Sequence, residues 1–354
     1  MKLQHKFGLL LSSLSLFSFI SSAEAEPKVV TSIKPIHSLV SYVMDGVGRP
    51  DLLVDGSSSP HTFQLKPSHA TMLQEADIVF WIGEDLESFL ETPLDSIAAS
   101  AKRVTLMDSD QIELLKFREK NVFDDHHDDH DDHDEHEDHA DGHDDHDEHD
   151  EHDEHDEHDE HDEHDEHDDH EEHADGHDDH DEHGHHHGEH DIHFWLDPEI
   201  AKTIVSIASE ELSEIDPANK SIYSSNAANA INDLDQLIDN TRSKINSDAT
   251  YIVFHDAYQY FEQRFGIEVI GALTVNPEVL PGAKQLAEIR EVIEHESVNC
   301  LFSEPQFNPS IAETIASDTG IKSAVLDPLG AELEPGKDLY FDLIGDMASS
   351  FENC

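Results

Sequence analysis

Histidine is the residue type in this sequence that is most informative about metal binding or catalysis. Of its 31 histidines, 24 lie between residues 126 and 190, and one lies within the first 25 residues. Neutral imidazole is the commonest metal ligand in proteins. The sequence has no His-Glu-x-x-His helix, no Gly-x-Ser-x-Gly turn and no phosphate-binding loop, so metal binding is favoured over catalysis. The six histidines that remain are His37, His61, His69, His193, His255 and His295.

Three of these histidines stand next to the predicted ends of strands. His255 follows the apolar run "TYIVF", and His61 lies in the polar loop "DGSSSPHTFQLKPSH" after the run "DLLV". His193 occurs in "DIHFWLDPEIAK", where Asp197 before Pro198 predicts a helix N-cap preceded by a short extended segment. Open α/β sheets bind ligands at the carboxyl ends of their strands. Spacing alone does not show that the three histidines converge.

Residues 124–191 form an acidic tract of unusual composition. The tract holds 38 of the 82 Asp and Glu residues, with no Lys or Arg, and Asp147–His167 is seven Asp-Glu-His triplets. A period of three does not keep histidines on one helical face, and so little apolar content predicts a disordered loop. The tract is either a solvated acidic loop or a weak collector of several metal ions. A net charge of -62 argues against nucleic-acid binding.

The two ends of the chain indicate an exported protein. Residues 1–25 combine two lysines, an apolar run and the small-x-small site Ala23-Glu24-Ala25, which predicts a cleaved signal peptide. No later segment is apolar enough to span a membrane, so we expect no membrane insertion of the mature chain. The two cysteines, Cys300 and Cys354, predict one disulfide in an oxidising compartment.

Strand-like and helix-like segments alternate in both halves of the chain. This alternation predicts an α/β fold with two lobes, each built on a mostly parallel four-stranded sheet covered by helices. Between the halves, apolar residues recur at helical spacing over 217–246, which predicts one long rigid helix. The predicted lobes cover residues 26–216, including the acidic tract, and 247–354. A ligand cleft is expected between them.

Several motifs resemble those of one family along nearly the whole mature chain. They are "GSSSPHTFQLKPS", "HFWLDPEIA", "VFHDAYQYFE", "TVNPEVLPGAKQL", "SEPQF" and "LDPLG". Together they look like the periplasmic zinc-binding proteins of high-affinity zinc ABC importers, the zinc branch of the metal-binding cluster 9 family. An acidic His-rich insert before the second ligand motif and a Cys pair placed like Cys300 and Cys354 are also typical of that branch.

The resemblance implies a Zn²⁺ site in the cleft formed by His61, His193 and His255. Some relatives have Glu just before the first ligand, whereas this sequence has Pro60. Asp327 matches a carboxylate that completes the site in manganese relatives, so either Asp327 or water is expected as the fourth ligand. The zinc would be delivered to a membrane permease by a monomeric periplasmic protein that is not an enzyme. Two alternatives stay open at this point: an exported zinc hydrolase, and a zinc buffer or sensor without a transporter.

Overall fold

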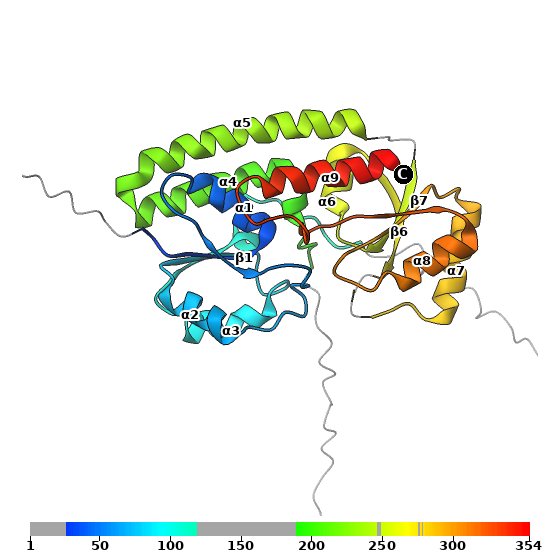
Figure 1. The fold of residues 1–354 in the computed structure, drawn as a ribbon, viewed down its shortest axis with the longest axis horizontal. Coiled ribbons are helices and arrows are strands. Elements are labelled where there is room, and N and C mark those ends of the chain that lie inside the picture. Colours follow the sequence, from blue (N-terminus) through cyan, green and yellow to red (C-terminus); the bar gives the residue numbers. More distant parts are fainter. Residues whose placement is uncertain (1–25, 119–188, 246–248, 275–276, 278) are drawn as a thin grey trace, which may run out of the picture. The chain divides into compact units, whose positions relative to one another are not determined.

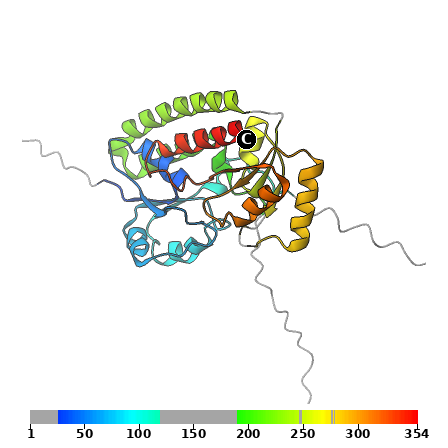
Figure 2. The same ribbon diagram turned by 45° about the vertical axis from the view of Figure 1, so that its right-hand side comes forward.

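The computed structural model describes residues 26–118, 189–245, 249–274, 277 and 279–354. The predicted signal segment 1–25 and all of the acidic tract except its last three residues lie outside this part of the chain. Two parallel four-stranded sheets organise the described residues, with helices packed on them (Figure 1 and Figure 2). The α/β class predicted from the alternating segments is confirmed.

The first lobe is built on a parallel sheet with strand order β2-β1-β3-β4. All five residues of the central strand β1 are buried, as expected for a parallel strand covered on both faces. Helices α2 and α3 lie on one side of this sheet, and α1 and α4 lie on the other (Figure 1). The elements are β1 (Val29–Ile33), α1 (Lys34–Val43), β2 (Asp51–Val54), α2 (Pro67–Glu75), β3 (Ile78–Trp81), α3 (Ser88–Ser96), β4 (Lys102–Thr105), η1 (Leu106–Asp108), η3 (Phe194–Leu196) and α4 (Pro198–Ile215).

The second lobe repeats this arrangement with strand order β6-β5-β7-β8. Alternate residues of its central strand serve different clusters: Ile252 and Phe254 pack into a small core with α7 and α8, whereas Tyr251 and Val253 join the larger core. The elements are β5 (Thr250–His255), α6 (Gln259–Phe265), β6 (Glu268–Thr274), α7 (Ala283–His295), β7 (Cys300–Ser303), α8 (Ser310–Thr319) and β8 (Lys322–Val325).

One long helix lies between the two sheets in the sequence. Helix α5 (Lys220–Lys244) has 25 residues and follows the short 3-10 turn η4 (Pro217–Asn219). At 1.5 Å per residue it spans about 37 Å. Its buried residues include Ala227, Leu234 and Ile238 of the predicted apolar stripe. It packs on α1, α4 and the last helix, α9 (Leu339–Asn353). The predicted long helix is confirmed and starts after the turn at Pro217.

The last helix, α9 (Leu339–Asn353), contacts both lobes. Near its start, the Tyr340 hydroxyl donates to the backbone oxygen of Trp195 at 2.7 Å. Near its end, the Phe351 ring lies 5.0 Å from the Tyr251 ring of β5. Cys354 then forms a disulfide with Cys300 at the start of β7. The sequence places this helix in the second lobe, but its contacts join the two lobes, as do those of the larger core.

The residues that precede the acidic tract are paired with its last three residues. The backbone of Lys116 pairs with that of His190 in an antiparallel bridge. The Phe117 amide donates to the Glu189 carbonyl at 3.3 Å, and the Asp191 amide donates to the Leu115 carbonyl at 2.8 Å. We call this pairing of 115–117 with 189–191 the tract seam.

The described part of the chain contains no candidate membrane-spanning helix. None of its helices combines the length and the apolar character that crossing a bilayer requires.

Candidate metal centre

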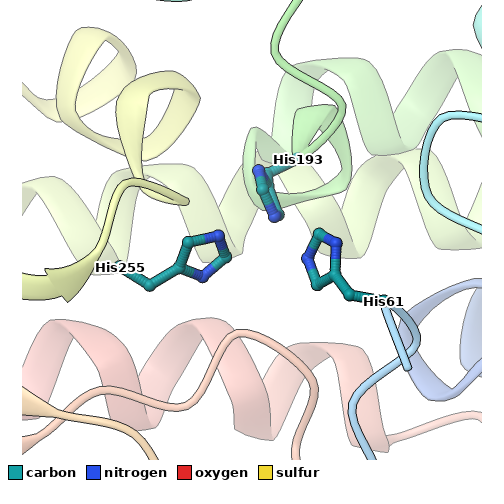
Figure 3. Close-up of side chains that lie close together, drawn as sticks. All are labelled: His61, His193 and His255. Atoms are coloured by element: carbon teal, nitrogen blue, oxygen red, sulfur yellow. The ribbon is translucent and has the colours of Figure 1, made fainter. Parts of the chain in front are cut away.

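The three histidines that the sequence predicted to lie next to strand ends are together in the structure (Figure 3). One ligand nitrogen of each of His61, His193 and His255 lies within 4.8 Å of the other two. The ring centroids are separated by 5.8 Å for His61 and His193, 5.4 Å for His61 and His255, and 4.9 Å for His193 and His255. Within the described residues, this is the one group of three or more possible metal ligands found at such distances.

Each histidine comes from a different element. His61 belongs to the loop between β2 and α2, His193 immediately precedes the 3-10 turn η3, and His255 is the last residue of β5. His193 and His255 are 3% and 4% exposed, whereas His61 is half-buried. Solvent therefore reaches the cluster most readily at His61.

The segment around His193 differs from the sequence-based expectation. We predicted a short extended segment before the helix cap, but Phe194–Leu196 form one turn of 3-10 helix with all three side chains buried. The Asp191 carboxylate accepts the His193 backbone N–H at 2.9 Å, which bends the chain in a way that residue alternation does not reveal. The predicted cap is confirmed, because the Asp197 carboxylate accepts the Glu199 amide at 2.8 Å and Pro198 starts α4.

Asp191 also orients the His193 ring. Its Oδ1 lies 2.8 Å from His193 Nδ1, and its side chain is fully buried. An Asp carboxylate accepts a hydrogen bond from Nδ1–H, which leaves the unprotonated Nε2 as the ligand atom. Such a partner fixes the tautomer of a metal-binding histidine and makes it a better ligand. The sequence held this signal in "DIH", but we did not identify it.

Glu304 occupies a related place beside His255. One of its oxygens, Oε2, lies 3.7 Å from His255 Nδ1, and the residue is 4% exposed. His255 Nδ1 and Glu304 Oε1 each have no hydrogen-bond partner among the described residues. A small rotation of the ring brings His255 Nδ1 within hydrogen-bond distance of the Glu304 carboxylate. Glu304 follows the strand β7, so its position at a carboxyl end was visible in the sequence.

The predicted ligand Asp327 is engaged in other contacts. Its Oδ1 accepts from Gln306 Nε2 at 2.8 Å and from the amides of Leu329 and Gly330 at 3.0 Å each. Its Oδ2 accepts from the Ala331 amide at 2.5 Å. Asp327 is not a member of the three-histidine group, and its role as a fourth ligand stays a prediction.

The other three histidines are placed away from the cluster. His37 Nε2 lies 3.1 Å from the Pro50 carbonyl oxygen, and burial lowers the pKa of this ring. His69 Nδ1 accepts the Lys66 amide at 3.2 Å and caps α2. His295 is exposed near the end of α7. None of these three histidines is therefore part of the three-histidine group.

Apolar side chains line the pocket around the three histidines. They belong to Leu86, Trp195, Phe307, Pro328 and Leu329. An apolar shell limits the access of water to a metal site and lowers the local dielectric constant. A larger groove of about 990 Å³ lies along α9 and contains none of the three histidines.

Acidic side chains with raised pKa values lie on the second-lobe side of the cluster. Burial raises the pKa of Glu262 to about 7, and burial likewise raises the pKa of Asp256, which follows His255. Arg118 pairs with both carboxyl groups and opposes these shifts. A cation at the cluster interacts favourably with the buried Asp191 carboxylate and favours the ionised forms of Asp256 and Glu262.

Two α/β lobes with a cluster of three histidines suit a solute-binding protein for a metal ion. A family model described as the periplasmic component A of the zinc-uptake complex, ZnuA, matches residues 29–354. The chain therefore belongs to the ZnuA family of solute-binding proteins, which serve transport and are not enzymes. The hydrolase alternative is thereby excluded.

Curated relatives match over nearly their full length. The high-affinity zinc uptake system protein ZnuA of Brucella abortus (strain 2308) is 43% identical over 351 residues, with 98% of each chain covered. The protein of the same name from Yersinia pestis is 33% identical over 352 residues, covering 99% of this chain and 97% of that one.

Solved structures share the fold at lower identity. A crystal structure of ZnuA has a TM-score of 0.66 at 20% identity, covering 92% of this chain and 97% of that chain. The solute-binding protein FpvC from Pseudomonas aeruginosa, in complex with Mn²⁺, has a TM-score of 0.65 at 17% identity, covering 92% and 96%. Because the fold occurs with different metals, the donor atoms of the site must identify the metal here.

Proposed function

We propose that this chain captures one Zn²⁺ between His61, His193 and His255 and delivers it to the membrane permease of an ABC-type importer. The observation that carries the proposal is the convergence of three imidazoles from three separate elements within 4.8 Å. The names of the relatives, which are high-affinity zinc uptake proteins, support the same cargo.

The donor set favours zinc over manganese. Zn²⁺ is borderline-soft and accepts imidazole nitrogen at 2.0 to 2.1 Å in tetrahedral geometry, whereas Mn²⁺ prefers oxygen donors. In a tetrahedral site the ligand nitrogens lie about 3.3 Å apart. Nitrogens that already lie within 4.8 Å of one another reach this separation through small side-chain rotations.

The fourth position is proposed to be filled by Asp327 or by water. Use of Asp327 requires the exchange of hydrogen bonds that its carboxylate now accepts from Gln306 and from backbone amides. Water needs no such exchange. Absorption spectra with Co²⁺ in place of zinc, compared between the wild type and Asp327→Asn, distinguish the two arrangements.

We further propose that the acidic tract 124–191 collects additional zinc weakly and passes it to the three histidines. Its 24 histidines and many carboxylates supply transient ligand sets without a fixed cage. The tract seam pairs the segment before this tract with its last residues, and one of these, Asp191, is two residues from His193 in sequence.

The cellular setting follows from the family and from the sequence. The first 25 residues are proposed to direct export and to be removed, leaving a monomeric periplasmic protein. Contacts that join the two lobes, including those of α9, oppose spontaneous opening. Release is therefore proposed to require the permease, which separates the lobes around the site.

Zinc titration by calorimetry tests the two classes of site. We would compare the mature chain with a variant that lacks residues 124–186, since this deletion leaves the tract seam intact. We expect one tight site in both proteins and a weaker phase of several ions only in the intact chain. His193→Ala should abolish the tight site and keep the weak phase.

Loss of all tight binding on deletion would instead make the tract the zinc receptor. If both proteins bind zinc as expected, a strain that lacks the gene for this protein is grown in zinc-depleted medium. Its growth distinguishes an importer component from a zinc buffer. A zinc buffer without a transporter predicts normal growth, whereas an importer component predicts a growth defect that added zinc corrects.

A further inference from the structure

The loop from residue 327 to 333, between β8 and α9, is held from two sides. The Asp327 carboxylate accepts the amides of Leu329, Gly330 and Ala331, as described above. On the other side, Lys34 Nζ donates to the carbonyl oxygens of Gly330 at 3.1 Å, Ala331 at 2.9 Å and Leu333 at 3.0 Å. These contacts cross from the first lobe to a loop of the second, almost 300 residues away in sequence.

Lys34 stands where local preferences disfavour a lysine. It is the first residue of α1, where the helix dipole is unfavourable for a positive charge, and it is only 3% exposed. Burial of an ammonium group is costly unless its donors are satisfied. An ammonium has three N–H donors, and three backbone carbonyls accept them here. The loop contacts therefore offset the cost of placing a cation at this position.

The same ammonium also reaches the loop that carries His61. Lys34 Nζ lies 3.4 Å from Asp55 Oδ1, and Asp55 directly follows β2 at the start of that loop. Pro328 and Leu329 of the 327–333 loop line the histidine pocket. A single buried cation thus connects two loops that border the metal site, one from each lobe.

We propose that Lys34 is a positioning residue for the metal site, acting as a clasp between the His61 loop and the 327–333 loop. The Lys34 ammonium contacts these two loops and none of the three histidines, so its effect on the metal site runs through the loops that it holds. This proposal rests on the proposed function, since it concerns the retention of zinc at that site. Loss of the clasp lets the pocket wall at Pro328 and Leu329 move, and bound zinc then leaves faster.

Zinc dissociation kinetics test the clasp. The mature chain lacking residues 124–186 would be loaded with one equivalent of zinc and mixed with an excess of chelator in a stopped-flow instrument. For Lys34→Met we expect a dissociation rate raised at least about tenfold, equivalent to about 1.4 kcal/mol, with a smaller change in the association rate. Lys28→Met, which removes an exposed lysine just before β1, is the matched control and should leave both rates unchanged.

Two further measurements separate positioning from general loss of structure. The Co²⁺ absorption spectrum should be the same in wild type and Lys34→Met, because the three histidines are retained. If Lys34→Met does not fold, Asp55→Asn decides the question, since Asp55 is 65% exposed and its replacement leaves the carbonyl contacts of Lys34 in place. For that variant we expect dissociation about two to three times faster, as for the loss of one exposed ion pair.

An unchanged dissociation rate in folded Lys34→Met with full zinc stoichiometry would overturn the clasp. In the event that Lys34→Met is unfolded, an unchanged rate in Asp55→Asn would overturn it. Failure of the wild-type protein to bind zinc would be a different result, because it would refute the proposed function itself.

Discussion

Asp191→Asn is the substitution that most directly tests whether the Asp191 carboxylate orients the His193 ring for metal binding. The Asp191 carboxylate lies 2.8 Å from His193 Nδ1 and also accepts the His193 backbone amide. Asn has nearly the same shape, and its carbonyl oxygen is able to accept both hydrogen bonds. The substitution therefore removes the negative charge while the bend of the chain is preserved.

The size of the effect follows from that geometry. Loss of a hydrogen-bonded partner behind a metal-binding histidine lowers metal affinity about 10- to 100-fold, or about 1.4 to 2.7 kcal/mol. Because Asp191 is fully buried, solvent does not screen its charge, and we expect a value toward the upper end of that range. His193→Ala should have a larger effect, since it removes a ligand rather than the partner of one.

The assay is competition with a chromophoric zinc chelator, using the variant without residues 124–186 so that only the tight site is measured. Asp197→Asn is a matched control. Asp197 is also a buried aspartate close to His193 in sequence, but its carboxylate binds the Glu199 amide and the Arg264 guanidinium. We expect Asp197→Asn to lower stability while zinc affinity changes less than threefold. Equal affinities of Asp191→Asn and wild type would refute the orienting role.

Two other predictions concern stability. Burial raises the pKa of Glu87 from 4.5 to about 7, so between these values the native state binds more protons than the unfolded chain and stability falls as pH rises. Urea unfolding should show a loss of about 3 kcal/mol from this group between pH 4.5 and 8, absent in Glu87→Gln, and parallel pH profiles would contradict it. Cys354→Ser opens a loop with a sequence separation of 54 and should lower the free energy of unfolding by about 4 kcal/mol. The wild type under reducing conditions should match that variant, and a change below 1 kcal/mol would count against the estimate.

The sequence predicted individual strands, helices and a helix cap because each of them depends on a pattern of neighbouring residues. The buried strand β1 is rich in β-branched residues, and α5 shows an apolar stripe with helical spacing. Asp197 followed by Pro198 marked the start of α4. These features depend on neighbours within a few residues, which is the range over which sequence patterns act.

The features that the sequence did not predict all depend on contacts between residues far apart in the chain. The sequence supplied three histidines at strand ends, but their convergence depends on how two separate sheets pack. The link from Lys34 to the carbonyls of residues 330–333 has no local signature, since lysine at the start of a helix would normally face solvent. The two-lobe contacts of α9 were missed for the same reason, because its partners, such as Trp195, lie far away in sequence.

The tract seam has a consequence for how this protein can change in evolution. Because residues 115–117 and 189–191 are paired, a segment inserted between them leaves and returns at one fixed place. For a flexible segment, each doubling of length adds only about 0.6 kcal/mol to the free energy of closing the loop. Repeats such as Asp-Glu-His can thus be gained or lost with little effect on the fold. Under the proposed role of the tract, the number of its histidines is therefore a quantity that selection can adjust separately from the histidine cluster.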